Sequence, residues 1–361
     1  MTRKRNILLY PFALIYGAVT GIRNFMYNTG ILRSFKFRTP IICVGNITVG
    51  GTGKTPHTEY LVELLKDKYR IATLSRGYMR KSRGFRLADR SSSVADLGDE
   101  PLQIHRKYPD ITVAVDRDRV HGVRRLIKAP DGIEVIILDD GFQHRRLKPG
   151  YTILLTDYNR LMIRDHLLPY GDLRESRLAM YRTDIILVTK SPADLQPIQR
   201  RLIAKEMDKA AYQNIYFTCF RYLEPLPVFK HTSSGNEDME IDAAESFGVV
   251  LVTGIANPDP LKEYIENQYD EVIHFRYRDH HRYTEKDLIK ISEALNNLGS
   301  EIKRVLTTEK DAVRLAEFTN IAEPLRSSLF YIPIGIEFLN EDRDEFNNLI
   351  LKYVRKNKRD S

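Results

Sequence analysis

The chain has 361 residues, enough for two domains, and its 42% of hydrophobic residues can form substantial cores, which excludes a disordered protein. Its two cysteines, Cys43 and Cys219, exclude a disulfide framework and a cysteine-based zinc site. The net charge of +8 is confined to the N-terminal region, where no acidic residue precedes Glu59. Eight basic residues there account for the whole excess, so the charge does not indicate a nucleic-acid-binding surface: Arg3, Lys4, Arg5, Arg23, Arg33, Lys36, Arg38 and Lys54.

Residues 7–22, "ILLYPFALIYGAVTGI", form an uncharged stretch within an N-terminal segment of residues 1–38. A spanning helix needs about 20 apolar residues, and Pro11 and the glycines weaken this one. We therefore expect an interfacial membrane anchor, with apolar side chains in the lipid and arginines on anionic headgroups. Two alternatives stay open: a helix packed on the protein's own core, and a spanning or cleaved segment.

The stretch "TVGGTGKTP", residues 48–56, follows an apolar run, "TPIICVGNI", and opens a helix-like run, "TPHTEYLVELLKDKY". This strand, loop and helix predict a phosphate-binding loop in which backbone N–H groups surround the phosphates of ATP, the lysine contacts the terminal phosphates and the threonine hydroxyl ligates Mg²⁺. The first position is Thr48 where the usual pattern has glycine, and with Asn46 it leaves polar side chains for a second substrate. The predicted nucleotide-binding residues are Gly50, Gly51, Thr52, Gly53, Lys54 and Thr55.

Further apolar, strand-like runs follow, separated by amphipathic or irregular segments, and they predict a parallel sheet covered on both faces: "RIATLSRG", "ITVAVD", "EVIILDD", "YTILLTD" and "DIILVTK". We expect a core domain over residues 39–215. Residues 216–247 contain two prolines and a polar tip, which predict a hairpin-like connector. A second α/β domain is expected over 248–361, beginning at "GVVLVTG".

The strand "EVIILDD" ends in adjacent carboxylates, Asp139 and Asp140. An apolar strand ending in this way is typical of the element that holds Mg²⁺ opposite the loop threonine. Because successive strand residues point to opposite faces, we expect one of the two carboxylates to be directed at the metal. The following "GFQHRR" brings His144 to the same sheet edge, where open α/β folds bind ligands, although a single histidine is as readily structural.

Two further motifs hold candidate proton-transfer groups. In "GDEP", Asp99 provides a carboxylate suited to accept the proton of an attacking hydroxyl, but an acid two residues before a proline is also an ordinary helix cap. "RDHHRYT" contains His280 and His281, and histidine pairs on loops are commonly only solvated.

In this order, "GNITVGGTGKTP", "SRGY", "GDEP", "DDGFQHRRL", "LLPYGDLRE", "TGIANP", "DHHRYT" and "TTEKDAVRL" closely resemble the tetraacyldisaccharide 4'-kinases of lipid A biosynthesis, over nearly the whole chain. The resemblance implies an ATP-dependent kinase with Mg²⁺ that phosphorylates the 4'-hydroxyl of a tetraacylated glucosamine disaccharide 1-phosphate to form lipid IVA. It implies a peripheral enzyme on the cytoplasmic face of the inner membrane of a Gram-negative bacterium. The implied fold is α/β: a P-loop NTPase-like α/β/α sandwich, a smaller α/β/α subdomain joined by a two-stranded linker, and an N-terminal membrane-associated helix.

Carried onto this chain, the resemblance assigns phosphate and catalytic contacts to Lys54, the metal to Thr55, Asp139 and Asp140, and proton abstraction to Asp99 with His280 of the second domain as its partner. Domain closure would bring these two together and exclude water. The implied substrate-binding residues are Asn46, Thr48, Arg76, Arg119, His144, Arg174 and Glu175. Arg117 is an alternative to Arg119, His281 is an alternative to His280, and Tyr170 stands where the family often has a small residue.

A rival class is the membrane-associated P-loop switch ATPase of the partition or positioning type, whose loop also reads Gly-Gly-x-Gly-Lys-Thr. Those proteins carry a lysine just before the two glycines, where this chain has Val49. They also tend to bind membranes through a C-terminal helix. A P-loop kinase or ligase for a small soluble metabolite would not need residues 1–38. The sequence therefore favours the lipid kinase.

Overall fold

The computed structural model describes residues 6–229 and 246–359. The chain forms two compact units. Unit 1 comprises residues up to 221 together with those from 335 onward, and unit 2 comprises residues 222–334. Basic residues 3–5 and the polar tip of the expected connector lie outside the described residues.

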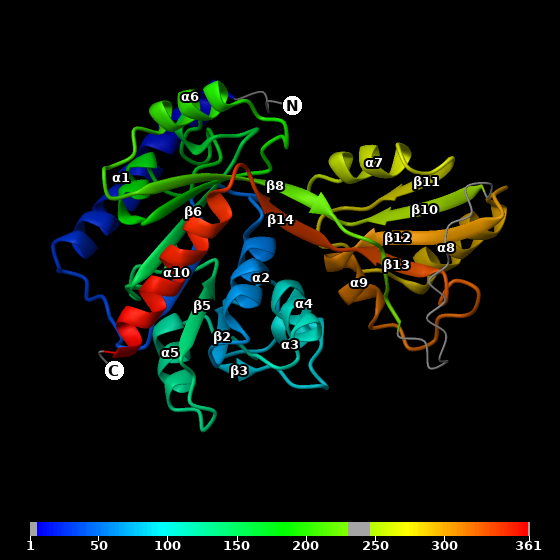
Figure 1. Cartoon of the computed structure of the whole chain (residues 1–361), viewed down its shortest axis with the longest axis horizontal. Coiled ribbons are helices and arrows are strands. Elements are labelled where there is room, and N and C mark those ends of the chain that lie inside the picture. The colour runs from blue at the N-terminus through cyan, green and yellow to red at the C-terminus, as the bar shows by residue number, and fades with distance from the viewer. Residues whose placement is uncertain (1–5, 230–245, 360–361) are drawn as a thin grey trace. The chain divides into compact units, whose positions relative to one another are not determined.

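Unit 1 is built on a nine-stranded sheet whose seven central strands run parallel, with an antiparallel strand, β14 or β3, at each edge (Figure 1). Its order is β14 (Ile334–Phe338), β8 (Asn214–Tyr222), β7 (Ile185–Thr189), β6 (Tyr151–Asp157), β1 (Ile41–Asn46), β5 (Val135–Asp139), β2 (Ile71–Ser75), β4 (Thr112–Val115) and β3 (Arg86–Leu87). Each predicted apolar run is one of these strands. The predicted parallel sheet is therefore confirmed.

Helices cover both faces of this sheet because successive strand residues point to opposite sides. Ile42 and Val44 of β1 pack against α2 (Lys54–Leu65), α4 (Asp99–Lys107) and α10 (Asp342–Arg359). On the other face, Ile41 and Cys43 share a core with α5 (Arg119–Ile127). The core of that face continues over β6 and β7 to the 3₁₀ helices η2 (Met162–Arg164) and η3 (Arg177–Arg182) and to α6 (Pro197–Met207). A short α3 (Val94–Leu97) precedes α4.

Unit 2 repeats the three-layer plan on a smaller scale. Its sheet has the order β11 (Glu271–Arg276), β10 (Phe247–Thr253), β12 (Ile302–Thr308), β13 (Leu329–Ile332) and β9 (Leu226–Pro227). Helix α7 (Asp259–Glu266) packs on one face, and α8 (Glu285–Asn297) and α9 (Glu309–Leu315) pack on the other. The predicted second α/β domain is therefore present.

The chain passes between the units twice, through β8 and β14, which are neighbours in the nine-stranded sheet. Leu339 N donates to Phe217 O at 2.9 Å and Leu223 N donates to Pro333 O at 3.0 Å, so the two segments run in opposite directions. The connection is thus two-stranded, as the resemblance implied, but it is not the hairpin expected at 216–247. The expected boundary at 248–361 also differs from the structure, because β14 extends the sheet of unit 1 and α10 covers its face.

The N-terminal segment forms η1 (Ile7–Leu9) and α1 (Tyr10–Asn28), which is blue in Figure 1. One side of α1 contacts unit 1: Ala13 is buried, and Tyr16 Oη donates to Arg174 O at 2.9 Å. The other side exposes a continuous apolar surface: Ile7, Leu8, Phe12, Leu14, Ile15, Val19, Ile22 and Phe25. By length and composition alone, Ile7–Asn28 would suffice to cross a membrane. One side of α1 therefore packs on unit 1, and its other side is an exposed apolar face.

Candidate active site

The phosphate-binding loop lies between β1 and α2, where the sequence predicts it. Gly50 and Gly53 have φ values of +104° and +84°, conformations that residues with a Cβ rarely adopt, and Gly53 caps the N-terminus of α2. Asn46 Nδ2 donates to Thr52 Oγ1 at 2.9 Å, and Lys54 Nζ lies 3.4 Å from Asn46 Oδ1. The loop thus places Lys54 at the carboxyl end of β1 and at the N-terminus of a helix, a site suited to anions.

Asn46 and Thr48 lie beneath the loop and are fully buried. Asn46 organises the loop through its contacts with Thr52 and Lys54. Thr48 forms an antiparallel bridge with Leu173, one residue before Arg174. In this conformation the two polar side chains support the loop from inside, and direct contact with a second substrate stays a prediction.

The predicted carboxylates come together with Lys54 and two arginines. Lys54 Nζ lies 3.7 Å from Asp140 Oδ1, and Arg174 Nη1 lies 3.4 Å from Asp140 Oδ2. The buried guanidinium of Arg119 donates to the backbone oxygen of Asp140 at 3.3 Å. Asp140 has a φ of +53°, a left-handed conformation that turns its side chain away from the strand direction. Five predicted residues from four segments of the sequence therefore meet at one sheet edge.

Asp139 lies at the end of β5 and is buried, with Thr58 Oγ1 3.4 Å from its Oδ1. Burial raises its pKa to about 7, and the negative charge of Asp140 adds to the rise. The buried Oδ1 of Asp140 has no hydrogen-bond partner among the described residues. Asp139, with its raised pKa, and the adjacent Asp140 fit a divalent cation, because oxygen ligands and negative charge are what Mg²⁺ prefers.

Arg119 and Arg117 differ in exposure: Arg119 is buried and Arg117 is exposed. Arg119 Nη1 donates to Arg117 O at 3.1 Å, so the backbone around Arg117 holds the guanidinium of Arg119 near Asp140. Arg76 is exposed at the end of β2, and its charge contributes to a lowered pKa of Arg119, whose main cause is burial. Of the two arginines, the geometry therefore favours Arg119 as the one that lies beside Asp140.

His144 and Glu175 occupy the margin of this cluster. Burial lowers the pKa of His144 to about 4, and Arg119 lowers it further, so the imidazole is neutral near pH 7. Glu175 is buried and accepts hydrogen bonds from Arg182 at 2.7 Å and from Asn24 of α1 at 2.8 Å. Glu175 therefore fastens α1 to unit 1, and a contact with substrate stays a prediction.

Asp99 is the first residue of α4 and is 5% exposed. The preceding Gly98 has a φ of +89°, and a Cβ there would lie 2.6 Å from the backbone oxygen of Tyr78. The helix begins at Asp99 and its N-cap is Gly98, so Asp99 is not the cap residue. Its role as the base stays a prediction.

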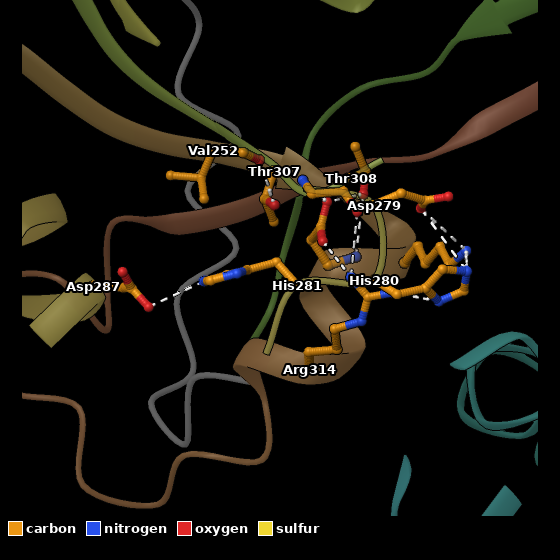
Figure 2. A network of polar contacts seen from close by, with 11 residues as sticks. Val252, Asp279, His280, His281, Asp287, Thr307, Thr308 and Arg314 are labelled. Atoms are coloured by element: carbon orange, nitrogen blue, oxygen red, sulfur yellow. Dashed lines mark hydrogen bonds and ion pairs between the residues drawn. The ribbon is translucent and has the colours of Figure 1, made fainter. Parts of the chain in front are cut away.

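The two histidines of "RDHHRYT" have different surroundings within unit 2. His281 Nε2 lies 3.1 Å from Asp287 Oδ2, and its ring stacks on Tyr277 with centroids 4.3 Å apart. His280 instead contacts Lys310 and Arg314 of α9 (Figure 2). Both histidines thus have partners within unit 2, and the choice of His280 as the functional histidine stays a prediction.

The model for the family described as "Tetraacyldisaccharide-1-P 4'-kinase" matches residues 5–355 of this chain. The chain belongs to the tetraacyldisaccharide 4'-kinase family. The "Tetraacyldisaccharide 4'-kinase" of Bacteroides thetaiotaomicron is 46% identical over 98% of this chain and 94% of its own length, and that of Flavobacterium johnsoniae is 44% identical over 97% of both. A crystal structure of the "apo" form of LpxK from Aquifex aeolicus in complex with ATP is 26% identical with a TM-score of 0.72, covering 96% of this chain and 98% of that one. The α/β fold and the kinase assignment are therefore confirmed.

Two features of this tetraacyldisaccharide 4'-kinase were missed by the sequence analysis. His57 of α2 contacts the phosphate loop through its ring: Nδ1 lies 2.7 Å from Gly53 O, and Nε2 lies 3.0 Å from Thr218 Oγ1 of β8. Lys190, which follows β7, donates to Gly51 O and to Asp157 Oδ2. Lys190 could have been predicted from the sequence, because it directly follows an apolar strand, and the carboxyl ends of parallel strands lie at the edge of the sheet where ligands bind. Nothing in the spacing of His57 distinguishes it from an ordinary helix residue.

Proposed function

We propose that this member of the tetraacyldisaccharide 4'-kinase family transfers the γ-phosphate of ATP to the 4'-hydroxyl of a tetraacyldisaccharide 1-phosphate at a lipid surface, with the site residues in the roles given below. The observation that carries the proposal is the meeting of Lys54 with Asp140 and Arg174 at the phosphate loop of a chain that matches the family over its full length. Family membership supports the reaction, and the contacts at the phosphate loop support the proposed roles of these residues.

In the proposed reaction, the backbone of the loop and Lys54 hold the β- and γ-phosphates of ATP. Thr55, Asp139 and Asp140 would hold Mg²⁺, which supplies positive charge to the phosphates. Arg119 and Arg174, both beside Asp140, are placed to balance the charge of this acidic pair and of the substrate. Binding at this edge orients the γ-phosphorus toward the acceptor.

Asp99 is the proposed base. It takes the proton of the 4'-hydroxyl as the 4'-oxygen bonds to the γ-phosphorus and the bond from that phosphorus to the β–γ bridging oxygen breaks, releasing ADP. His280 of unit 2 is proposed to approach the Asp99 carboxylate in the substrate complex, where closure would also exclude water and limit ATP hydrolysis. The burial of Asp99 and the contact of His280 with the buried guanidinium of Arg314 support these roles.

The exposed apolar face of α1 is the proposed site of membrane association. A tetraacyl substrate leaves a bilayer only at a cost of about 0.8 kcal/mol for each CH₂ exposed to water, so a kinase for it gains by approaching the lipid surface. Helix α1 forms hydrogen bonds with Glu175 and with the backbone of Arg174, and the Arg174 side chain in turn contacts Asp140. We infer that the substrate reaches the phosphate loop along this side of unit 1, at the cytoplasmic face of the inner membrane.

The test is transfer of label from γ-labelled ATP to tetraacyldisaccharide 1-phosphate in detergent micelles. Wild-type protein should label the lipid, whereas Lys54→Ala and Asp99→Asn should lower kcat by on the order of 10²-fold or more. Arg304→Met, on β12 of unit 2 at a side chain that packs on Phe247 and Phe330, is the control and should keep wild-type rates. ATP hydrolysis by the wild type without labelled lipid would contradict the proposal and indicate a switch ATPase.

A further inference from the structure

The backbone holds His280 in one conformation. It lies between β11 and α8 with a φ of +58°, and its N–H donates to Gly254 O at 3.1 Å. Figure 2 shows its ring beside the side chain of Arg314, while His281 points the other way toward Asp287. The left-handed turn therefore separates the two neighbouring histidines and directs only His280 at α9.

Each ring nitrogen of His280 faces a basic side chain. Arg314 Nη2 lies 3.2 Å from Nδ1, and Lys310 Nζ lies 3.2 Å from Nε2. A guanidinium donates hydrogen bonds but has no acceptor, so the contact with Arg314 requires a lone pair on Nδ1. A neutral imidazole with its lone pair on Nδ1 carries its proton on Nε2.

We propose that Arg314 is a positioning residue that fixes His280 as the tautomer protonated at Nε2, so that His280 enters the reaction as a hydrogen-bond donor to an anionic oxygen. This inference rests on the proposed function for the identity of that oxygen, which is the carboxylate of Asp99. With the Nδ1 lone pair engaged by Arg314, the ring offers Nε2–H and leaves proton abstraction to the carboxylate.

Arg314 can set the tautomer because it is itself fixed. It is 6% exposed, and its Nη1 donates to Asp311 Oδ1 at 2.9 Å and to Gly254 O at 3.4 Å. Asp311 is fully buried and its other oxygen accepts from Gly254 N at 2.8 Å and from Thr308 Oγ1 at 2.7 Å. A buried carboxylate with this many partners holds the guanidinium in one place.

Lys310 would favour the opposite tautomer through its contact with Nε2, but it constrains the ring less than Arg314 does. Its ammonium stands on a flexible chain, its side chain is 21% exposed, and Asp279 Oδ1 lies 3.8 Å from Nζ. It can therefore turn toward Asp279 when Nε2 carries the proton, whereas Arg314 has no comparable freedom. Arg314, the more rigid of the two donors, therefore determines that Nδ1 of His280 is the nitrogen that accepts a hydrogen bond.

The experiment reads the tautomer directly, by long-range ¹H–¹⁵N correlation spectra of the full-length protein labelled at its nine histidines, without substrate. His280 is assigned from the signal lost in His280→Gln. The matched pair is Lys310→Met, which removes the basic neighbour of Nε2, against Asp311→Asn with Arg314→Met, which removes the basic neighbour of Nδ1. Asp311 and Arg314 are changed together because either change alone would leave a buried charge unpaired. We expect Nε2–H in the wild type and in Lys310→Met, and a mixture of tautomers in the double variant.

Observation of Nδ1–H in the wild type, or of the wild-type tautomer in the double variant, would overturn the inference. Activity gives a second readout. His280→Gln, whose amide N–H occupies the region of Nε2, should keep more activity than His280→Ala, and the double variant should lose on the order of 10-fold in kcat relative to the wild type. If the tautomer is as expected but His280→Ala transfers phosphate at the wild-type rate, the proposed role of His280 fails while the Arg314 inference stands.

Discussion

The ring of His57 lies against the carbonyl oxygen of Gly53, with Nδ1 at 2.7 Å, and so joins helix α2 to the glycine that begins it. Burial lowers the pKa of His57 to about 4, so the ring is neutral near pH 7, donates from Nδ1 to Gly53 and accepts at Nε2 from Thr218. One side chain thereby couples the phosphate loop to β8, the strand along which the chain leaves unit 1.

Replacement of His57 by leucine should weaken nucleotide binding, because Gly53 loses the contact that holds its left-handed conformation. We expect the Kd for ATP to rise on the order of 10-fold, equivalent to roughly 1.4 kcal/mol. Thr218→Val removes only the contact at Nε2 and should have a smaller effect. Nucleotide titration by calorimetry measures both, and equal affinities in the three proteins would show that the contact does not organise the loop.

Asp140→Asn should raise the free Mg²⁺ concentration needed for half-maximal transfer, on the order of 10-fold, because the amide supplies one fewer charged oxygen at the proposed metal site. Asp67→Asn, an exposed acid beyond the far end of α2, is the control and should leave the Mg²⁺ requirement unchanged. An unchanged Mg²⁺ requirement in Asp140→Asn would remove this carboxylate from the metal site.

The outward face of α1 predicts a measurable lipid affinity. Ile15→Glu places a charge on a side chain that is 63% exposed and should reduce binding to anionic phospholipid vesicles by about 10-fold or more, since burial of an isoleucine contributes roughly 1.5–3 kcal/mol. Ile289→Glu, on α8 of unit 2 and 57% exposed, is the matched control. Vesicle co-sedimentation compares them, and equal losses would indicate that α1 is not the contact.

His144 should make the free energy of unfolding depend on pH. Its pKa in the folded protein is about 4, below the ordinary value of 6.5, because burial and Arg119 disfavour the charged ring. The unfolded chain therefore binds more protons between these values, and the stabilisation present above about pH 6.5 is lost as the pH falls toward 4. His144→Asn should lose less stability over this interval than the wild type, by on the order of 1 kcal/mol, because solvent around the partly exposed ring screens the effect. Urea unfolding at several pH values measures the difference, and parallel curves would contradict it.

Much of the fold follows from local sequence patterns. Short β-branched runs predicted the strands of the central sheet, and the glycines of "TVGGTGKTP" predicted the loop between β1 and α2, because these features depend on residues close together in the chain. The boundary of unit 2 was not predicted correctly. Residues 335–359 return to unit 1, since β14 pairs with β8 and Phe346 of α10 packs in the core formed with strand β1 and helix α2. Such pairing depends on a partner over a hundred residues away.

The same distinction holds at the site. The motifs alone determined that Lys54, Asp139 and Asp140 are candidates, because their chemistry is carried by residue type and short spacing. The roles expected for Asp99 and His280 came from the resemblance to the family. Only the tertiary structure decided that Arg119 is buried beside Asp140, that Glu175 fastens α1, and that Arg314 contacts His280 while Asp287 contacts His281. The physical reason is that burial and hydrogen-bond direction are set by which segments pack together, and a linear spacing does not contain that information.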